Sequence, residues 1–196
     1  MKSLASSVLV LLAACGAVAV PPERSYRLPA PDAVAPAAVR DERVLRVDDF
    51  KLAAHLSADH LMVADGPVLL RPYPLERWAG PLDGMVSELV VGCLRRASAF
   101  AEVKTNADAG SEDLQLAGTL LDFHHDRGAG QVRVRMLLRL HRVRDGLLIV
   151  AQELSTCRPV ASEEPAAVVA ALAQAAIALA EDLARVCGEA AAAPGR

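Results

Sequence analysis

The sequence predicts an α+β domain in which two helices pack on one face of a largely antiparallel sheet. Apolar and polar residues alternate over several segments, and short Gly-containing turns separate those segments. Two other stretches carry apolar residues at helical spacing. The clearest alternation lies in residues 131–141, where one face holds Val132, Val134, Met136, Leu138 and Leu140.

Turn residues divide the chain into elements. Asp65–Gly66 and Asp145–Gly146 are pairs that accept positive φ, so each predicts a hairpin. The predicted order is a strand over residues 43–50, a hairpin turning at 65–66, a helix over 81–97, a polar loop over 106–113, strands turning at 126–130 and 145–146, and a final helix over 165–188.

The final helix has signals at both ends. Ser162 can cap it, Pro165 suits its first turn, and Gly188 is expected to stop it. Its apolar stripe is interrupted by charged residues such as Glu181 and Arg185, so the sequence favours a core helix over a membrane span.

The first 14 residues are typical of a cleaved bacterial signal peptide. Lys2 precedes an apolar run that is too short to cross a bilayer. The run closes on Leu-Ala-Ala-Cys, a lipobox, which predicts lipid attachment at Cys15. An alternative cut after Ala17-Val18-Ala19 would instead release a soluble protein that begins at Val20.

Lipid attachment sets the expected domain organisation. Acyl chains on Cys15 would hold the protein on a membrane surface without a spanning helix. Gly16 follows the cysteine and favours the inner leaflet of the outer membrane, by the sorting rule of enteric bacteria. The expected segments are a signal peptide (1–14), a lipidated Pro-rich tether (15–42), one domain (43–188) and a disordered tail (189–196).

Charge and motifs exclude several classes of function. The formal net charge is −3, and loss of Lys2 with the signal peptide makes it more negative, which argues against nucleic-acid binding. No Walker loop, nucleophile elbow, dinucleotide fingerprint or zinc-helix motif occurs in the sequence. We therefore expect a protein that is not an enzyme and has no catalytic residue and no cofactor.

Cysteines and histidines offer few candidates for chemistry. Cys93 falls on the apolar face of the first helix and is expected to be a buried free thiol; if any disulfide forms, Cys157 and Cys187 are the pair we would choose. His124, His125 and Asp126 are adjacent in a strand and point to alternate faces, so no metal site is expected. His55 and His60 are interpreted as solvated loop residues.

Two surface features allow two interpretations each. The row formed by Arg133, Arg135 and Arg139 would either bind phospholipid headgroups or an acidic partner, or simply solvate the open face of the sheet. The segment from Tyr73 to Trp78 would hold either an aromatic anchor of the loop or a contact for a partner protein.

Several segments together resemble the ABC-type transport auxiliary lipoproteins (PqiC-like), which accompany Mce-type lipid transporters in the Gram-negative envelope. The resemblance covers nearly the whole mature chain. It rests on the lipobox cysteine, Tyr26-Arg27-Leu28, Arg71-Pro72-Tyr73, the stretch Glu76-Arg77-Trp78-Ala79-Gly80-Pro81 that leads into an amphipathic helix, and the closing Ala- and Leu-rich helix.

The resemblance implies a non-catalytic periplasmic protein that works with a permease, an ATPase and an Mce-domain protein to move phospholipid or another hydrophobic substrate between membranes. Tyr73, Arg77 and Trp78 would be its partner-contact residues. A structural or assembly lipoprotein that stabilises an outer-membrane complex is the alternative. A transport role predicts an Mce protein as partner, whereas an assembly role predicts an outer-membrane barrel or a cell-wall component.

Overall fold

A computed structural model describes residues 22–31, 33–37 and 40–192. The proposed signal peptide, Cys15 and the alternative cleavage site lie outside these residues. In chain order the elements are β1 (Arg24–Tyr26), β2 (Asp41–Val47), β3 (Lys51–Leu52), β4 (His60–Asp65), β5 (Leu69–Trp78), α1 (Leu82–Ala97), β6 (Phe100–Lys104), β7 (Leu114–Asp126), β8 (Gln131–Arg142), β9 (Leu148–Pro159) and α2 (Pro165–Ala192).

The strand β7 organises the whole sheet. One of its edges pairs antiparallel with β8 along almost its full length, and β8 pairs antiparallel with β9. Its other edge pairs in parallel with β2 near its start, β3 in the middle and β4 at its end. The sheet is therefore mixed, with its longest ladders antiparallel, and the expected α+β class is confirmed.

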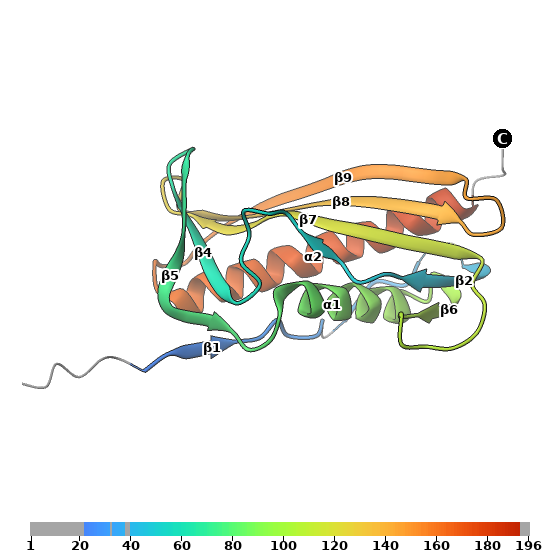
Figure 1. The fold of residues 1–196 in the computed structure, drawn as a ribbon, viewed down its shortest axis with the longest axis horizontal. Helices are drawn as coiled ribbons and strands as arrows, with labels where there is room; N and C mark the ends of the chain where they lie inside the picture. The colour runs from blue at the N-terminus through green and yellow to red at the C-terminus, as the bar shows by residue number, and fades with distance from the viewer. Residues whose placement is uncertain (1–21, 32, 38–39, 193–196) are drawn as a thin grey trace, which may run out of the picture.

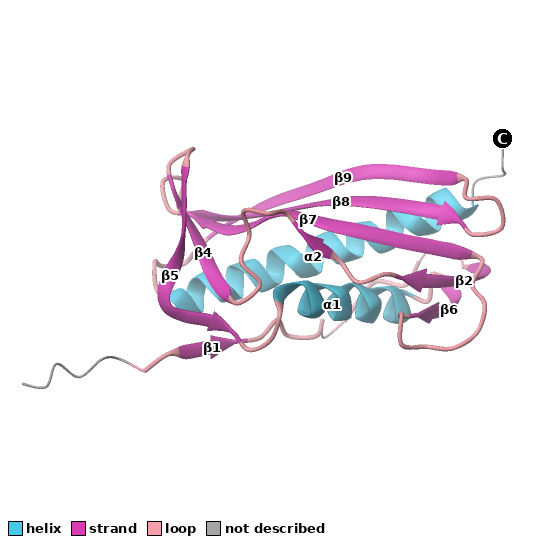
Figure 2. Cartoon of the chain, in the orientation of Figure 1, coloured by secondary structure: helices cyan, strands magenta, loops and turns pink. Residues whose placement is uncertain are grey.

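Both helices cover one face of the sheet (Figures 1 and 2). The alternating residues of β8, from Val132 to Leu140, are fully or almost fully buried. They share one hydrophobic core with buried residues of α2 such as Leu172, Leu179 and Leu183. Although α2 is long and apolar enough to span a membrane by length and composition, more than half of its most apolar stretch is buried inside the domain.

Phe50 fills the space between the sheet and α1. The amide of Phe50 donates a hydrogen bond of 2.8 Å to the Ser87 hydroxyl on α1. Its ring lies directly on Gly118 of β7, where a Cβ atom would come within 2.2 Å of the ring carbon Cε1. Glycine is therefore required at this position, because any side chain would displace the ring.

The hairpins, the first helix and the start of α2 agree with the sequence predictions, whereas the end of α2 does not. The helix α2 passes through Gly188 and continues to Ala192, so the predicted stop was wrong and residues 189–192 belong to the helix. Gly188 is itself buried in the helix, and one interior glycine costs only about 1 kcal/mol relative to alanine.

Ser162 lies too far from the start of α2 to cap it. Glu164 directly precedes Pro165, and the Glu164 carbonyl accepts the first backbone hydrogen bonds of the helix.

Candidate functional site

The segment that carries the resemblance lies where β5 turns a corner. Leu75 has a positive φ of 63°, and the pairing of β5 with β4 slips between His60 and Met62. The extra residues form a bulge, which bends a strand and changes which side chains face inward. As a result Tyr73 and then Glu76 and Trp78 are buried, while Arg77 remains partly exposed.

Beyond this bulge, β5 pairs with the N-terminal strand β1. Arg24–Tyr26 pairs in parallel with Glu76–Trp78, and Arg24 Nε donates a hydrogen bond of 3.0 Å to the buried Glu76 carboxylate. Tyr26 is partly buried and packs against the hydrophobic core. The part of the expected tether that contains the Tyr26-Arg27-Leu28 island is therefore docked on the domain.

Two of the three predicted contact residues lie in the core. Trp78 is 5% exposed, and its ring packs edge-on against Phe123 with centroids 5.6 Å apart. Tyr73 is 7% exposed. These aromatic rings are anchors, because a buried ring presents almost no surface to a partner. The sequence could not distinguish this anchor interpretation from surface contact, since the bulge at Leu75 is a product of tertiary packing.

Arg77 is the exposed member of the three. Its side chain is 41% exposed, and Nε lies 3.2 Å from a carboxylate oxygen of Glu23. An exposed ion pair of this kind contributes little to stability and is readily exchanged for a partner's charge. Of these three residues, Arg77 at the edge formed by β1 and β5 is therefore the one that a partner can reach.

A polar network joins β5 to β4 and β7. The Tyr73 hydroxyl and His125 Nδ1 are 2.6 Å apart, and Arg127 lies over the Tyr73 ring. Arg127 Nη1 also binds Asp65 at 2.9 Å. Burial lowers the pKa of His125, and the nearby Arg127 lowers it further, so both favour the neutral imidazole. This network links β5 to the end of β7 and to the turn that follows it.

Within the described ranges, no group of three or more His, Cys, Asp or Glu side chains is placed to hold a metal ion. His124 and His125 face opposite sides of β7, as expected for adjacent strand residues, and both are buried. His55 is half-exposed in a loop, but His60 begins β4, so its interpretation as a loop residue was wrong.

The three cysteines in the described part of the chain are free. Cys93 and Cys187 are buried, and Cys157 is exposed on β9. Cys93 matches the prediction of a buried thiol, whereas the pair considered for a disulfide, Cys157 and Cys187, does not form one. The two belong to different layers, because one is exposed on the sheet and the other lies inside the core.

The arginine row lies on the open face of the sheet among carboxylates. Arg135 Nε binds Asp122 at 2.7 Å and its Nη1 binds Glu153 at 3.1 Å. Arg133 lies 3.6 Å from Asp126. Carboxylates thus pair with Arg133 and Arg135, so the face is mixed in charge rather than uniformly basic.

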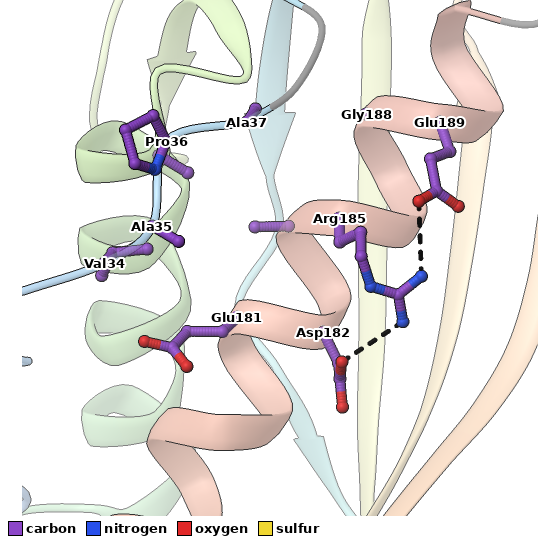
Figure 3. A pocket seen from close by; sticks show the side chains of 11 residues that line it. Val34, Ala35, Pro36, Ala37, Glu181, Asp182, Arg185, Gly188 and Glu189 are labelled. Carbon is purple, nitrogen blue, oxygen red and sulfur yellow. Dashed lines mark hydrogen bonds and ion pairs between the residues drawn. The ribbon is translucent and has the colours of Figure 1, made fainter.

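A cavity of about 330 Å³ lies where the segment 33–37 passes over α1 and α2. Figure 3 shows Val34 and Pro36 on one side and α2 on the other. Its rim carries Arg185, which binds Asp182 and Glu189 on the same helix (Figure 3). The small apolar residues here join the N-terminal segment to the helical layer.

The comparisons with known proteins decide the family. The sequence profile of the ABC-type transport auxiliary lipoprotein component matches residues 26–184. The chain belongs to this family. The match begins at Tyr26, the last residue of β1, and ends within α2, so it covers β2 to β9, α1 and most of α2 of the auxiliary lipoprotein.

Solved structures share the auxiliary lipoprotein fold. Protein XCC0632 from Xanthomonas campestris is 21% identical, with a TM-score of 0.77, over 85% of this chain and 96% of that one. The hypothetical protein CT253 from Chlamydia trachomatis is 12% identical, with a TM-score of 0.58, over 78% and 99% of the two chains. At these identities the likeness shows the fold alone. No protein of curated function matches the chain.

Proposed function

We propose that this auxiliary lipoprotein is a non-catalytic, lipid-anchored component of an Mce-type ABC transporter that moves phospholipid or another hydrophobic substrate across the envelope. The family match over residues 26–184 carries the proposal, because it makes the chain an auxiliary component of an ABC transport system. A partner ATPase would supply the energy, since the sequence has no Walker loop of its own. The permease and an Mce-domain protein would complete the system.

The anchor would be Cys15, in the inner leaflet of the outer membrane. The docking of β1 on β5 supports a close attachment. Only eight residues, 16–23, then lie between Cys15 and Arg24, and this stretch spans at most about 30 Å when fully extended. The domain would therefore stay next to the membrane and act on partners that reach it there.

Copurification tests the transport role. The full-length tagged protein is extracted from its own host in mild detergent, and the proteins that copurify are identified by mass spectrometry. Recovery of an Mce protein with its permease and ATPase supports the proposal. Recovery of only an outer-membrane barrel or a cell-wall component would replace it with the assembly role.

A charge reversal then locates the contact. Arg77→Glu is expected to weaken recovery of the partner, because Arg77 is exposed at the β1–β5 edge. Arg185→Glu is the matched control, since Arg185 is also an exposed arginine in surface ion pairs but lies on α2. Equal recovery with both variants would remove Arg77 from the interface.

Membrane attachment is tested separately. Cys15→Ser is expected to move the protein from the membrane fraction to the soluble fraction after cell breakage, because the lipid is the only proposed anchor. Retention of the variant on membranes that have been washed with high salt would contradict lipid anchoring at Cys15.

A further inference from the structure

A groove of about 750 Å³ lies between the β4–β5 hairpin and the open face of the sheet, outside the contact edge described above. Figure 1 shows this hairpin rising beside the turn between β7 and β8. The backbone holds it there, because the Arg127 amide donates a hydrogen bond of 3.1 Å to the Ala64 carbonyl. The volume is within the range of about 300–1,000 Å³ that is usual for ligand sites.

One wall of the groove is apolar. The hairpin contributes Pro67, Val68 and Leu69 to the lining. Val68 is 95% exposed and Leu69 is 54% exposed. Two adjacent large apolar side chains at a hairpin tip are exposed to water at a cost in free energy, which contact with a hydrocarbon chain would relieve.

The opposite wall is polar and carries both signs of charge. Arg133 of β8 lines it, together with Asp122 and Asp126 of β7. Asp122 uses Oδ2 to bind Arg135, while Oδ1 lies 3.7 Å from His55 Nε2 at the side of the groove. Arg133 is only loosely paired with Asp126, at 3.6 Å. A ligand with a positive and a negative group would find a counter-charge for each.

His124 adds to this wall a polar side chain with an unused hydrogen-bonding atom. The residue is 8% exposed and lines the groove, and its Nδ1 has no hydrogen-bond partner within the described residues. Burial lowers the pKa of His124. A neutral imidazole offers one donor and one acceptor, so it can bond with either an ammonium or a phosphate group.

We propose that this groove binds a zwitterionic phospholipid, with its ammonium at Asp122 and Asp126, its phosphate at Arg133, and an acyl chain along Val68 and Leu69. The proposal rests on the proposed role in lipid transport and names the class of lipid. A polypeptide fits less well, because β4 pairs with β5 on one edge and with β7 on the other, so an added strand cannot pair with β4 at the groove.

Photo-crosslinking tests the proposal. The full-length acylated protein is reconstituted in phosphatidylcholine vesicles that contain a trace of phosphatidylethanolamine with a photoactivatable acyl chain. Crosslinked peptides are then identified by mass spectrometry. We expect crosslinks in the β4–β5 hairpin. Crosslinks spread over the surface without enrichment there would overturn the proposal.

Matched variants separate the groove from general contact with the vesicle. Val68→Ser with Leu69→Ser is expected to lower hairpin crosslinking about tenfold, from lost apolar contact. Val143→Ser with Leu147→Ser is the control, since those exposed apolar residues lie at the β8–β9 turn.

Arg133→Glu should lower crosslinking. Arg139→Glu, on the same face of the sheet but outside the groove, should leave crosslinking unchanged. Equal effects of the paired variants would refute the site.

The headgroup is tested with phosphatidylglycerol that carries the same photoactivatable chain. We expect several-fold weaker crosslinking of this anionic lipid, because it lacks the ammonium that Asp122 and Asp126 would bind. Equal or stronger crosslinking would overturn the headgroup assignment. If the crosslinks occur and no transporter copurifies, the groove stands and the transport role fails. If a transporter copurifies and the crosslinks do not occur, only the groove is rejected.

Discussion

The Tyr73 hydroxyl and His125 Nδ1 lie 2.6 Å apart inside the domain and join β5 to β7 through a single hydrogen bond. His125 is completely buried, so no water replaces the phenol when that bond is lost. This pair also holds in place the strand that carries Arg77.

Tyr73→Phe is expected to lower the free energy of unfolding by about 1–3 kcal/mol, because the ring stays and the buried imidazole loses its partner. Denaturant unfolding followed by circular dichroism measures the change. In a His125→Phe background the same substitution should cost much less, since no polar atom is left unpaired. Equal costs in the two backgrounds would show that the hydrogen bond contributes nothing.

Stability is expected to fall as the pH drops below about 6.5. Burial lowers the folded-state pKa of both His124 and His125, so the unfolded chain takes up protons first and is favoured by acid. The loss begins near the unfolded pKa of about 6.5 and reaches at most about 1.4 kcal/mol per pH unit for each histidine. Unfolding measured between pH 8 and pH 5 tests this. His124→Gln with His125→Gln should flatten the profile, and an unchanged slope would assign the effect to other groups.

Gly118→Ala is expected to destabilise the protein by about 1–3 kcal/mol, because the added methyl would overlap the Phe50 ring. Thermal unfolding provides the measurement. Gly92→Ala in α1 is the control, since its added Cβ meets nothing within 4 Å, and alanine favours the helix by about 1 kcal/mol. Adding Phe50→Leu to Gly118→Ala should restore part of the loss. A neutral effect of Gly118→Ala would mean that Phe50 can move aside freely.

Thiol labelling should distinguish the cysteines. A maleimide is expected to modify Cys157 rapidly in the native protein, because Cys157 is exposed. Burial raises the pKa of Cys93 to about 11 and that of Cys187 to about 12, so these thiols should react only after unfolding. Mass spectrometry of the native and the denatured protein counts the labels. A fast second label on the native acylated protein would show that the α1–α2 layer opens readily.

Local pattern was sufficient for the antiparallel part of the fold. The alternation in β8 and the Gly-containing turns on either side of it predicted two hairpins, both of which form. Each of these pairings joins segments that are close in the chain, so the residues that specify it lie within one stretch of sequence. The first helix was predictable for the same reason, because its apolar face repeats over neighbouring turns.

The parallel pairings were not predictable in this way. β1 pairs with β5 and β6 pairs with β2, and each pairing joins strands that are far apart in the chain. Both β1 and β6 are short, and β6 alternates poorly because it is an edge strand. The packing of distant elements makes them strands, which a local pattern cannot show.

The sequence by itself determined the secondary structure of the β7–β9 region and α1, the residues of the buried face, and the resemblance to the auxiliary lipoproteins. Tertiary structure decided which residues a partner or a lipid can reach. The bulge at Leu75 buries Trp78 and exposes Arg77, and the β4–β5 hairpin sets Val68 opposite Arg133 across one groove. Both depend on how distant strands pack, and exposure is a property of that packing rather than of any one segment.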